Sequence, residues 1–367
     1  MNLLIFTYLF IYACAIGGVV LVGFILHLRK SKRVSGKSAI ASEEITVLVP
    51  FRNEEMRIGA LLESILKLEK MPNCFVFIDD HSTDGSCALI SKKLNGLPFE
   101  ICSLEEQIHG KKQALRMAID RSDTKYILTF DADVELPPNY FNDIELLEET
   151  DMYVLPAILV GQSPMEMLYE LDVVLANGLN TGLSGINRPI FCSGANLLFK
   201  RDVFSEVDDL ASHAHKASGD DTYLLRDFRK NRKDVRLVSN LNVAVFTETP
   251  HSFKEFIDQR LRWVGKTTDI GDPLATASAF GQFMLAIIFI VLLIVCGIYS
   301  DWNNFTLLFI GKICMDLVFF LPFFLRTERF LTWSLIPVYE LLFPFYSLLL
   351  GILMLIYTPS WKGRSIK

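Results

Sequence analysis

The 367-residue sequence has no Cys-x-x-Cys pair, although it contains seven cysteines. They lie singly, at positions 14, 74, 87, 102, 192, 296 and 314. An odd number of isolated cysteines is typical of a reducing compartment, and it argues against a disulfide framework or a zinc site. The chain also lacks an excess of positive charge. Its formal net charge of −6 therefore gives no indication of a nucleic-acid partner.

Hydrophobic residues are abundant: they make up 51% of the chain, and the mean hydropathy is +0.33. They are concentrated at the two ends. Leu3–Leu28 is apolar and long enough to span a bilayer, and the basic cluster Arg29–Arg33 follows it. A cleaved signal peptide is the weaker interpretation, because the run is too long and its charges come after it. Near the other end, three segments approach or exceed the spanning length: Phe280–Tyr299, Phe305–Phe324 and Leu331–Tyr357.

These patterns predict an integral protein of the inner or plasma membrane. The predicted order is a transmembrane anchor at 1–28, a basic linker at 29–43, a soluble domain at 44–250, an interfacial amphipathic helix at 251–275, about three membrane helices at 276–358 and a basic tail at 359–367. Basic segments stay on the cytoplasmic side, so we expect the soluble domain there. The sequence does not decide on which side of the membrane the C-terminus lies. Three spans after the soluble domain place it outside, whereas its basic tail favours the inside.

Strands and helices alternate in the first part of the soluble domain. Strands are predicted at Glu44–Pro50, Cys74–Ile78, Phe99–Leu104 and Tyr126–Phe130, and helical periodicity lies between them. This alternation predicts an α/β fold with a parallel, doubly wound sheet. Ligands of such sheets bind outside the carboxyl ends of the strands.

Asp131 and Asp133 leave the end of the fourth predicted strand on alternate positions, so both can project from the same side. A pair of carboxylates suits Mg²⁺ or Mn²⁺ that carries substrate phosphates. Asp-x-Asp occurs frequently by chance, however, and a solvated loop with two acids is the alternative.

Six segments in chain order carry a family resemblance: Val49–Glu55, Asp79–Gly85, Gly110–Lys111, Asp131–Asp133, Gly219–Asp221 and Gln259–Trp263. Together they resemble the family 2 glycosyltransferases, which are membrane-associated inverting enzymes with a GT-A fold, a Rossmann-like and mostly parallel sheet. The resemblance covers roughly residues 44–265 and implies a GT-A catalytic domain at 44–250. Two features depart from the family: the Gly-Asp-Asp form of the base motif, and a membrane region smaller than in most polysaccharide synthases.

The resemblance implies a set of donor-binding residues. Asp80 accepts a hydrogen bond from a uracil imide, and Lys111, beside a helix N-terminus, meets the diphosphate. Ordinary turn chemistry is the alternative for residues 79–85, and a solvated lysine is the alternative for Lys111. The nucleotide-sugar site is expected at Pro50, Arg52, Asn53, Glu54, Asp79, Asp80, Lys111 and Asp131, with the metal ion on Asp131 and Asp133.

The resemblance also places the chemistry. Asp221 is the expected general base, Asp220 is a supporting or alternative base, and Arg262 meets the leaving diphosphate. An acid that caps the following helix is the alternative interpretation of Asp221. Acceptor-side candidates are Ser193, Gly194, Asn196, Gln259 and Trp263. His213 and His215 are spaced like metal ligands but have no suitable third partner, so we interpret them as part of a loop.

The expected function is therefore inverting transfer of a sugar from a nucleotide-diphospho-sugar, with UDP as the expected nucleotide, to a membrane-associated lipid acceptor. A divalent metal ion and an aspartate base assist the transfer. The first alternative is a processive polysaccharide synthase. The second is a membrane scaffold with a degenerate transferase domain, against which the intact Asp131, Asp133, Asp221 and Arg262 argue.

Overall fold

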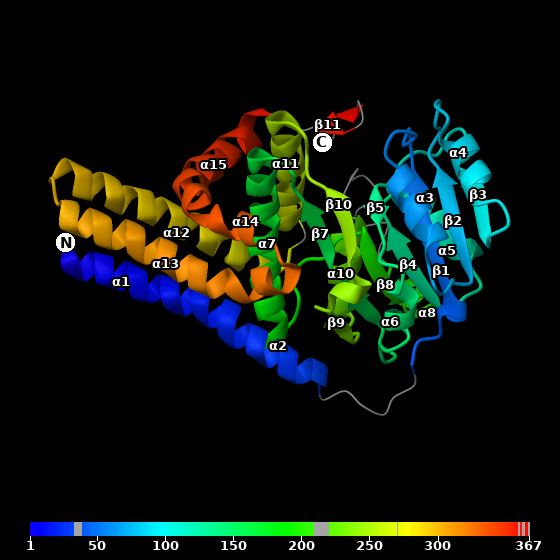
Figure 1. Cartoon of the computed structure of the whole chain (residues 1–367), viewed down its shortest axis with the longest axis horizontal. Helices are drawn as coiled ribbons and strands as arrows, with labels where there is room; N and C mark the ends of the chain where they lie inside the picture. The colour runs from blue at the N-terminus through cyan, green and yellow to red at the C-terminus, as the bar shows by residue number, and fades with distance from the viewer. Residues whose placement is uncertain (33–38, 209–219, 270, 359, 362–363, 366–367) are drawn as a thin grey trace. The chain divides into compact units, whose positions relative to one another are not determined.

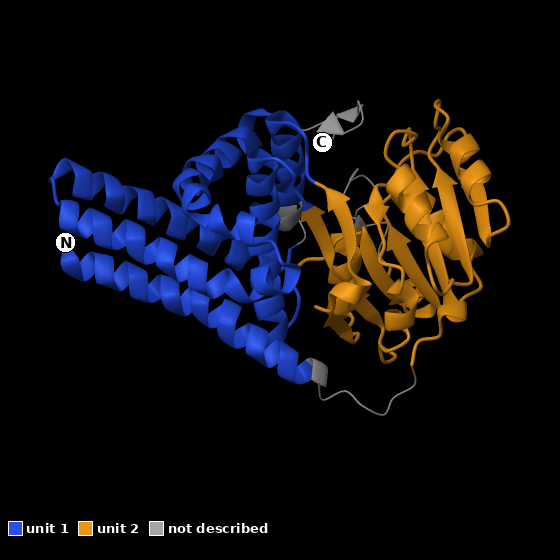
Figure 2. Ribbon diagram, viewed as in Figure 1, with its two compact units in different colours: residues 1–31, 160–190, 249–367 blue, residues 32–159, 191–248 orange. Residues whose placement is uncertain are grey.

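The computed structural model describes the whole chain except residues 33–38, 209–219, 270, 359, 362–363 and 366–367 (Figure 1). The side chain of Asp220 also lies outside the described part. The chain forms two compact units (Figure 2). Unit 1 comprises residues 1–31, 160–190 and 249–367, and unit 2 comprises residues 32–159 and 191–248.

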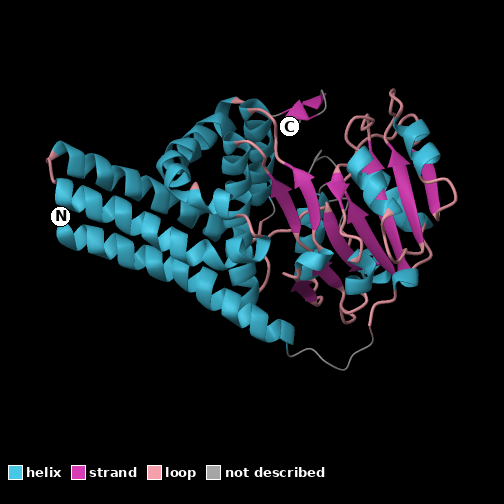
Figure 3. Ribbon diagram, in the orientation of Figure 1, coloured by secondary structure: helices cyan, strands magenta, loops and turns pink. Residues whose placement is uncertain are grey.

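Unit 2 is built on a large sheet, whose strands are magenta in Figure 3. This sheet has seven strands in the order β3-β2-β1-β4-β8-β6-β9. Its first four strands are parallel neighbours, and β8 runs antiparallel to β4 and β6. The bounds are β1 Ile45–Phe51, β2 Cys74–Asp79, β3 Phe99–Ser103, β4 Tyr126–Phe130, β6 Met152–Val154, β8 Asn196–Lys200 and β9 Val235–Leu237. The predicted α/β fold with a mostly parallel sheet is confirmed, and the four predicted strands lie within one or two residues of the observed ones.

A second sheet of three short strands has the order β5-β10-β7, with β5 at Val134–Glu135, β10 at Val245–Glu248 and β7 at Ala157–Val160. Among the described residues of unit 2, the helices are α3 Gly59–Leu66, α4 Ser86–Lys93, α5 Lys111–Arg121, α6 Tyr140–Ile144, α8 Arg201–Val207 and α10 Asp220–Lys230. Short 3₁₀ turns, η2 and η3, lie at Ser42–Glu44 and Leu241–Val243.

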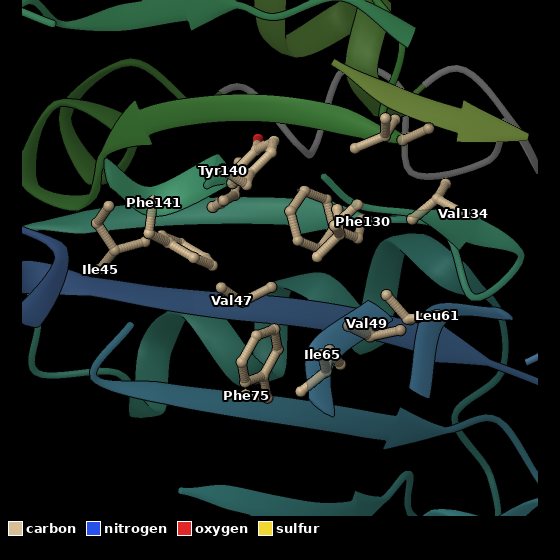
Figure 4. Packing of buried hydrophobic residues seen from close by; sticks show 14 of the residues in the cluster. Ile45, Val47, Val49, Leu61, Ile65, Phe75, Phe130, Val134, Tyr140 and Phe141 are labelled. Atoms are coloured by element: carbon tan, nitrogen blue, oxygen red, sulfur yellow. The ribbon is translucent and has the colours of Figure 1, made fainter. Parts of the chain in front are cut away.

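The central strands are buried on both faces, because successive side chains alternate between them. Val47 and Val49 pack with Phe75 and with α3 on one face (Figure 4). Leu48 points to the other face, where it joins a cluster from β4, β8, α5 and α10. Full burial of each large apolar side chain stabilises the fold by about 1.5–3 kcal/mol. This rigid sheet holds the loops at its carboxyl edge in place.

Unit 1 contains four helices that are long and apolar enough to cross a membrane: Asn2–Lys30, α12 Pro273–Ile298, α13 Trp302–Thr327 and α15 Ile336–Ile356. The predicted N-terminal apolar helix and C-terminal helical region are therefore confirmed. The first span consists of α1 Asn2–Tyr12, a π-helical stretch η1 Ala13–Val22 and α2 Gly23–Lys32. Pro322 and Pro344 lie inside α13 and α15 without ending them. The short helix α14, Phe330–Ser334, precedes α15.

Helix α7, Pro164–Ile186, was not predicted from the sequence. It begins with a capping box in which Ser163 and Glu166 exchange hydrogen bonds. Its glycines allow it to lie very close to the first span: a Cβ on Gly182 would lie 2.3 Å from the carbonyl oxygen of Val19. Small residues permit such backbone contact between helices.

Charged side chains are buried inside the helical bundle of unit 1. The Nζ of Lys312 lies 2.9 Å from the Oδ2 of Asp316, and it also donates to Glu340. The hydroxyl of Tyr12 donates to Asp316 at 2.5 Å. Glu340 is only 3% exposed, so its carboxylate is enclosed by protein. We call Tyr12, Lys312, Asp316 and Glu340 the buried ion cluster.

Helix α11, Phe253–Asp269, is the amphipathic segment expected at the membrane surface. Phe256, Ile257 and Leu261 form its buried face, together with Tyr169 of α7 and Leu350 of α15. Near the C-terminus, Ser360–Trp361 and Arg364–Ser365 pair as β11 and β12.

Candidate active site

The carboxyl edge of the large sheet brings the predicted motifs of unit 2 together. Phe51 at the end of β1 pairs with Asp79 at the end of β2. Phe130 at the end of β4 pairs with Asn196 at the start of β8, because these strands are antiparallel. The segments at 50–55, 79–86, 131–133 and 193–194 therefore share one edge. This is the edge where ligands bind in open α/β sheets.

Lys111, Asp131, Gly194 and Asp221 form the centre of this edge. The amide of Gly194 donates to the Oδ2 of Asp221 at 3.0 Å, and Lys111 forms an ion pair with Asp131. A Cβ on Gly194 would lie 3.5 Å from the Nζ of Lys111 and 3.7 Å from the Oδ2 of Asp221. The structure thus places the expected base, the expected phosphate-binding lysine and an expected metal ligand beside one another.

Asp221 occupies the first turn of α10, and its two oxygens have different partners. Oδ1 accepts from the amide of Thr222 at 2.8 Å and from the hydroxyl of Thr222 at 3.1 Å. Oδ2 accepts from Gly194, toward the centre of the site. The carboxylate of Asp221 therefore bonds the start of α10 and also faces the centre of the site. The side chain of Asp220, together with Gly219, His213 and His215, lies outside the described residues.

Asp133 belongs to an acidic group. Burial, followed by the charges of Asp131 and Glu54, raises the pKa of Asp133 to about 6, while Arg57 opposes the shift. The Nε of Arg57 lies 3.4 Å from the Oε2 of Glu54. Glu54 was expected in the nucleotide-sugar site, and the structure places its charge near Asp133. Repelling carboxylates gathered at a strand end are suitable hard oxygen ligands for Mg²⁺ or Mn²⁺.

The β1 and β2 exit loops are bonded to one another. Asn53 adopts a positive φ of 50°, and its Oδ1 accepts from the amide of Thr83 at 2.8 Å. Asp79 accepts from the amide of Ser82 at 2.9 Å. Although burial raises the pKa of Asp84, hydrogen bonds from the Ser86 side chain and nearby amides lower it more. Asn53, Asp79 and Asp84 therefore shape the loops, as turn chemistry predicts.

Asp80 and Arg52 lie at the same two loops. The carboxylate of Asp80 is 4% exposed and lies 3.8 Å from the Nη1 of Arg52. The amide of Asp80 donates to the carbonyl of Phe51 at 2.9 Å, which ties the second loop to β1. Pro50, the residue before Phe51, is half-buried in the same strand.

The predicted acceptor residues of unit 2 have distinct positions. The hydroxyl of Ser193 accepts from the amide of Ala195 at 3.3 Å, beside Gly194. Asn196 is fully buried: it accepts from the Tyr140 hydroxyl at 2.5 Å and donates to the carbonyls of Pro156 and Val243 at 2.7 and 2.9 Å. Because its amide is used inside the domain, we leave Asn196 out of the acceptor site proposed below.

Gln259, Arg262 and Trp263 lie on α11 and belong to unit 1, whereas the other candidate site residues belong to unit 2. Burial lowers the pKa of Arg262, and Asp258 opposes the shift. Arg260, on the same helix, was not among the expected site residues. Its side chain is 3% exposed, pairs with Asp172 and donates to the Tyr169 carbonyl at 3.0 Å. Its position on the apolar side of the amphipathic helix could have indicated that this arginine is buried and paired.

Comparisons with known proteins agree with this architecture. Residues 46–208 match the sequence model of Glycosyl transferase family 2. A "Probable glycosyltransferase" from Sulfolobus acidocaldarius is 21% identical over 74% of this chain and 59% of its own length. The 4,4'-diaponeurosporenoate glycosyltransferase of Staphylococcus aureus is 30% identical over 25% of this chain and 24% of its own length. The chain thus spans less than two thirds of either relative.

Among solved structures, the mannosyltransferase PcManGT from Pyrobaculum calidifontis, in complex with GDP-Man and Mn²⁺, has a similar fold. The TM-score is 0.60 at 16% identity, and the likeness covers 96% of this chain and 99% of that one. Residues 46–208 thus match a domain of glycosyltransferase family 2, and the mostly parallel sheet and the solved neighbour agree that this domain has a GT-A fold.

Proposed function

We propose that the chain is an inverting glycosyltransferase of the cell membrane that moves a sugar from a UDP-sugar to a lipid acceptor. The observation that carries the proposal is the grouping of Lys111, Asp131, Gly194 and Asp221 at the carboxyl edge of the sheet. Gly194 supports it further, since a side chain there would enter the space between the lysine and Asp221.

Residues of the β1 and β2 exit loops bind the nucleotide in this proposal. Asp80 accepts from the base, Arg52 and Pro50 lie beside it, and Lys111 meets the diphosphate at the start of α5. Asp131 and Asp133 would hold Mg²⁺ or Mn²⁺, with Glu54 nearby. When bound, the ion offsets negative charge on the leaving diphosphate. Lys111 must then exchange its bond to Asp131 for the phosphate.

Asp221 is the general base of the proposal. Its carboxylate removes the proton from the acceptor hydroxyl as that oxygen attacks the anomeric carbon opposite the leaving phosphate. The hydrogen bonds from Gly194 and Thr222 fix the carboxylate, so that little reorientation is needed during reaction. Asp220 remains the alternative base, and Arg262 is proposed to meet the diphosphate.

A membrane acceptor is supported by the four apolar helices and by the amphipathic α11. Ser193 and Gly194 are the acceptor-side residues proposed from unit 2, and Gln259 and Trp263 those from unit 1. The solved mannosyltransferase carries GDP-Man with Mn²⁺, and the staphylococcal relative is named for 4,4'-diaponeurosporenoate. Both names are compatible with a nucleotide-sugar donor and an apolar acceptor.

The test uses membranes that contain the full chain, supplied with Mn²⁺ and radiolabelled UDP-glucose, UDP-galactose, UDP-N-acetylglucosamine or GDP-mannose. We expect label from a UDP-sugar in the organic extract, as a lipid with one added sugar, and no label with Asp131→Ala. Label in a water-soluble polymer would support the processive alternative. Transfer that is undiminished in EDTA would contradict the metal-dependent mechanism, and the absence of transfer from every donor would favour the scaffold.

A further inference from the structure

Two histidines and an aspartate converge beside the expected nucleotide loops. Asp80 and His81 follow β2, and His109 precedes α5. One potential ligand atom from each lies within 4.8 Å of the other two. The Nδ1 of His109 is 3.9 Å from the Oδ1 of Asp80, and the two imidazole rings have centroids 4.5 Å apart. Two of the six histidines in the chain therefore meet across two separate loops.

The backbone and ring of His81 are held in an unusual way. His81 has a positive φ of 59°, which is uncommon for a residue other than glycine. Its Nε2 lies 2.9 Å from the carbonyl oxygen of Ile108. A carbonyl can only accept, so the proton is on Nε2 and the lone pair of the neutral ring is on Nδ1. Metal-binding histidines are typically oriented by such a bond from the other ring nitrogen.

The chemistry of the three ligands selects the type of metal. Two imidazole nitrogens and one carboxylate oxygen suit Zn²⁺ or Co²⁺, whereas the acids at Asp131 and Asp133 suit Mg²⁺ or Mn²⁺. No cysteine takes part, which is why the cysteine pattern did not indicate this group. Zinc bonds of about 2.0–2.2 Å require tetrahedral ligand atoms roughly 3.3 Å apart. The His109 side chain is 51% exposed and can rotate inward, while Asp80 is buried.

We propose that Asp80, His81 and His109 form a transition-metal site, and that a metal ion bound there competes with the nucleotide donor. The competition rests on the proposed function, in which Asp80 accepts a hydrogen bond from the base. A metal ion on the Asp80 carboxylate takes up the same oxygen atoms. Zn²⁺ is therefore an inhibitor of donor binding, distinct from the activating ion at the Asp131 side.

The first measurement is metal binding alone. The purified full chain in detergent is freed of metal, supplied with excess Mg²⁺ for the carboxylate site, and titrated with Co²⁺ while its visible absorption is recorded. We expect one equivalent of Co²⁺ in a tetrahedral environment, and at least a tenfold weaker affinity in His109→Ala. His251→Ala, which changes an exposed histidine of unit 1, is the matched control and should bind like the wild type. Equal Co²⁺ affinity in the wild type and His109→Ala overturns the site.

The second measurement is competition with UDP. With Zn²⁺ at ten times its own dissociation constant, the apparent dissociation constant for UDP should rise about tenfold in the wild type. It should change less than twofold in His109→Ala, which also controls for Zn²⁺ bound to free UDP. If zinc binds through His109 without weakening UDP binding, the competition is wrong. Sugar transfer by the wild type in zinc-free buffer with Mn²⁺ tests the proposed function separately, since it requires no zinc.

Discussion

Replacing Asp133 by asparagine should stabilise the metal-free protein while it removes metal binding. The Asp133 carboxyl is half-buried, and its desolvation together with the charges of Asp131 and Glu54 raises its pKa to about 6. Asparagine keeps the shape of the neutral acid and cannot ionise. The variant therefore removes an electrostatic penalty that the wild type carries whenever the site holds no cation.

The magnitude follows from the pKa shift. Asp133 has a pKa near 3.8 when unfolded and about 6 when folded, so ionisation disfavours the folded state. The penalty is absent below the unfolded pKa, grows as the pH rises from 3.8 to 6, and is complete above that. It amounts to about 3 kcal/mol at pH 7.5 and about 1 kcal/mol at pH 4.5. Asp133→Asn should be more stable than the wild type by these amounts at most.

The assay is thermal unfolding of the full chain in detergent with EDTA, at pH 7.5 and pH 4.5. We expect a higher Tm for Asp133→Asn at pH 7.5, by several degrees, and a smaller gain at pH 4.5. Mn²⁺ with UDP should raise the Tm of the wild type and leave the variant nearly unchanged. Glu135→Gln, an exposed acid in the same segment, is the control and should show neither effect. A variant less stable than the wild type in EDTA, or a gain independent of pH, would refute the reasoning.

Three further predictions concern other parts of the chain. Asp221→Asn should reduce the transfer rate by about 10²–10⁴-fold and change the UDP dissociation constant less than about tenfold, as single-turnover kinetics and calorimetry can measure; if Asp220→Asn alone slows transfer, Asp220 is the base. Lys312→Met should destabilise the detergent-solubilised protein by about 3–5 kcal/mol, because it leaves two buried acids without their cation, and adding Glu340→Gln should recover part of the lost Tm. A cysteine at position 35 in a cysteine-free chain should resist an impermeant thiol reagent in intact cells; labelling there would place unit 2 outside, and the same label at position 365 locates the C-terminus.

Much of the sheet was predictable because its strands are short apolar runs that end in turn-forming polar residues. Cys74–Ile78 was predicted as a strand, and β2 extends it by one residue to Asp79. Asp131 and Asp133 were expected at this edge because ligands bind at the carboxyl ends of parallel strands, and Lys111 was expected there from the family resemblance. The helices that are long and apolar enough to cross a membrane were equally predictable, because length and hydropathy alone define them.

Other features depend on contacts between residues distant in sequence, which periodicity does not encode. Asn196 was expected on the acceptor side of the site, yet its amide bonds the carbonyls of Pro156 and Val243 and the hydroxyl of Tyr140 in the core. The meeting of His81 with His109 depends on how two loops fold against each other. Helix α7 escaped prediction because its apolar face is interrupted by the glycines and polar residues that line its helix contacts.

The buried ion cluster has a consequence for how the protein enters its membrane. A lysine or an aspartate in the middle of a lone helix disfavours insertion by about 2.5–3.5 kcal/mol on translocon scales, and α13 carries both Lys312 and Asp316. Lys312 and Asp316 pair with each other within α13, and Tyr12 from the N-terminal helix and Glu340 from α15 supply the other partners of the cluster. The full set of partners therefore forms only when helices that are far apart in the sequence pack against α13. We therefore expect insertion of α13 to be cooperative with its packing against the N-terminal helix and α15.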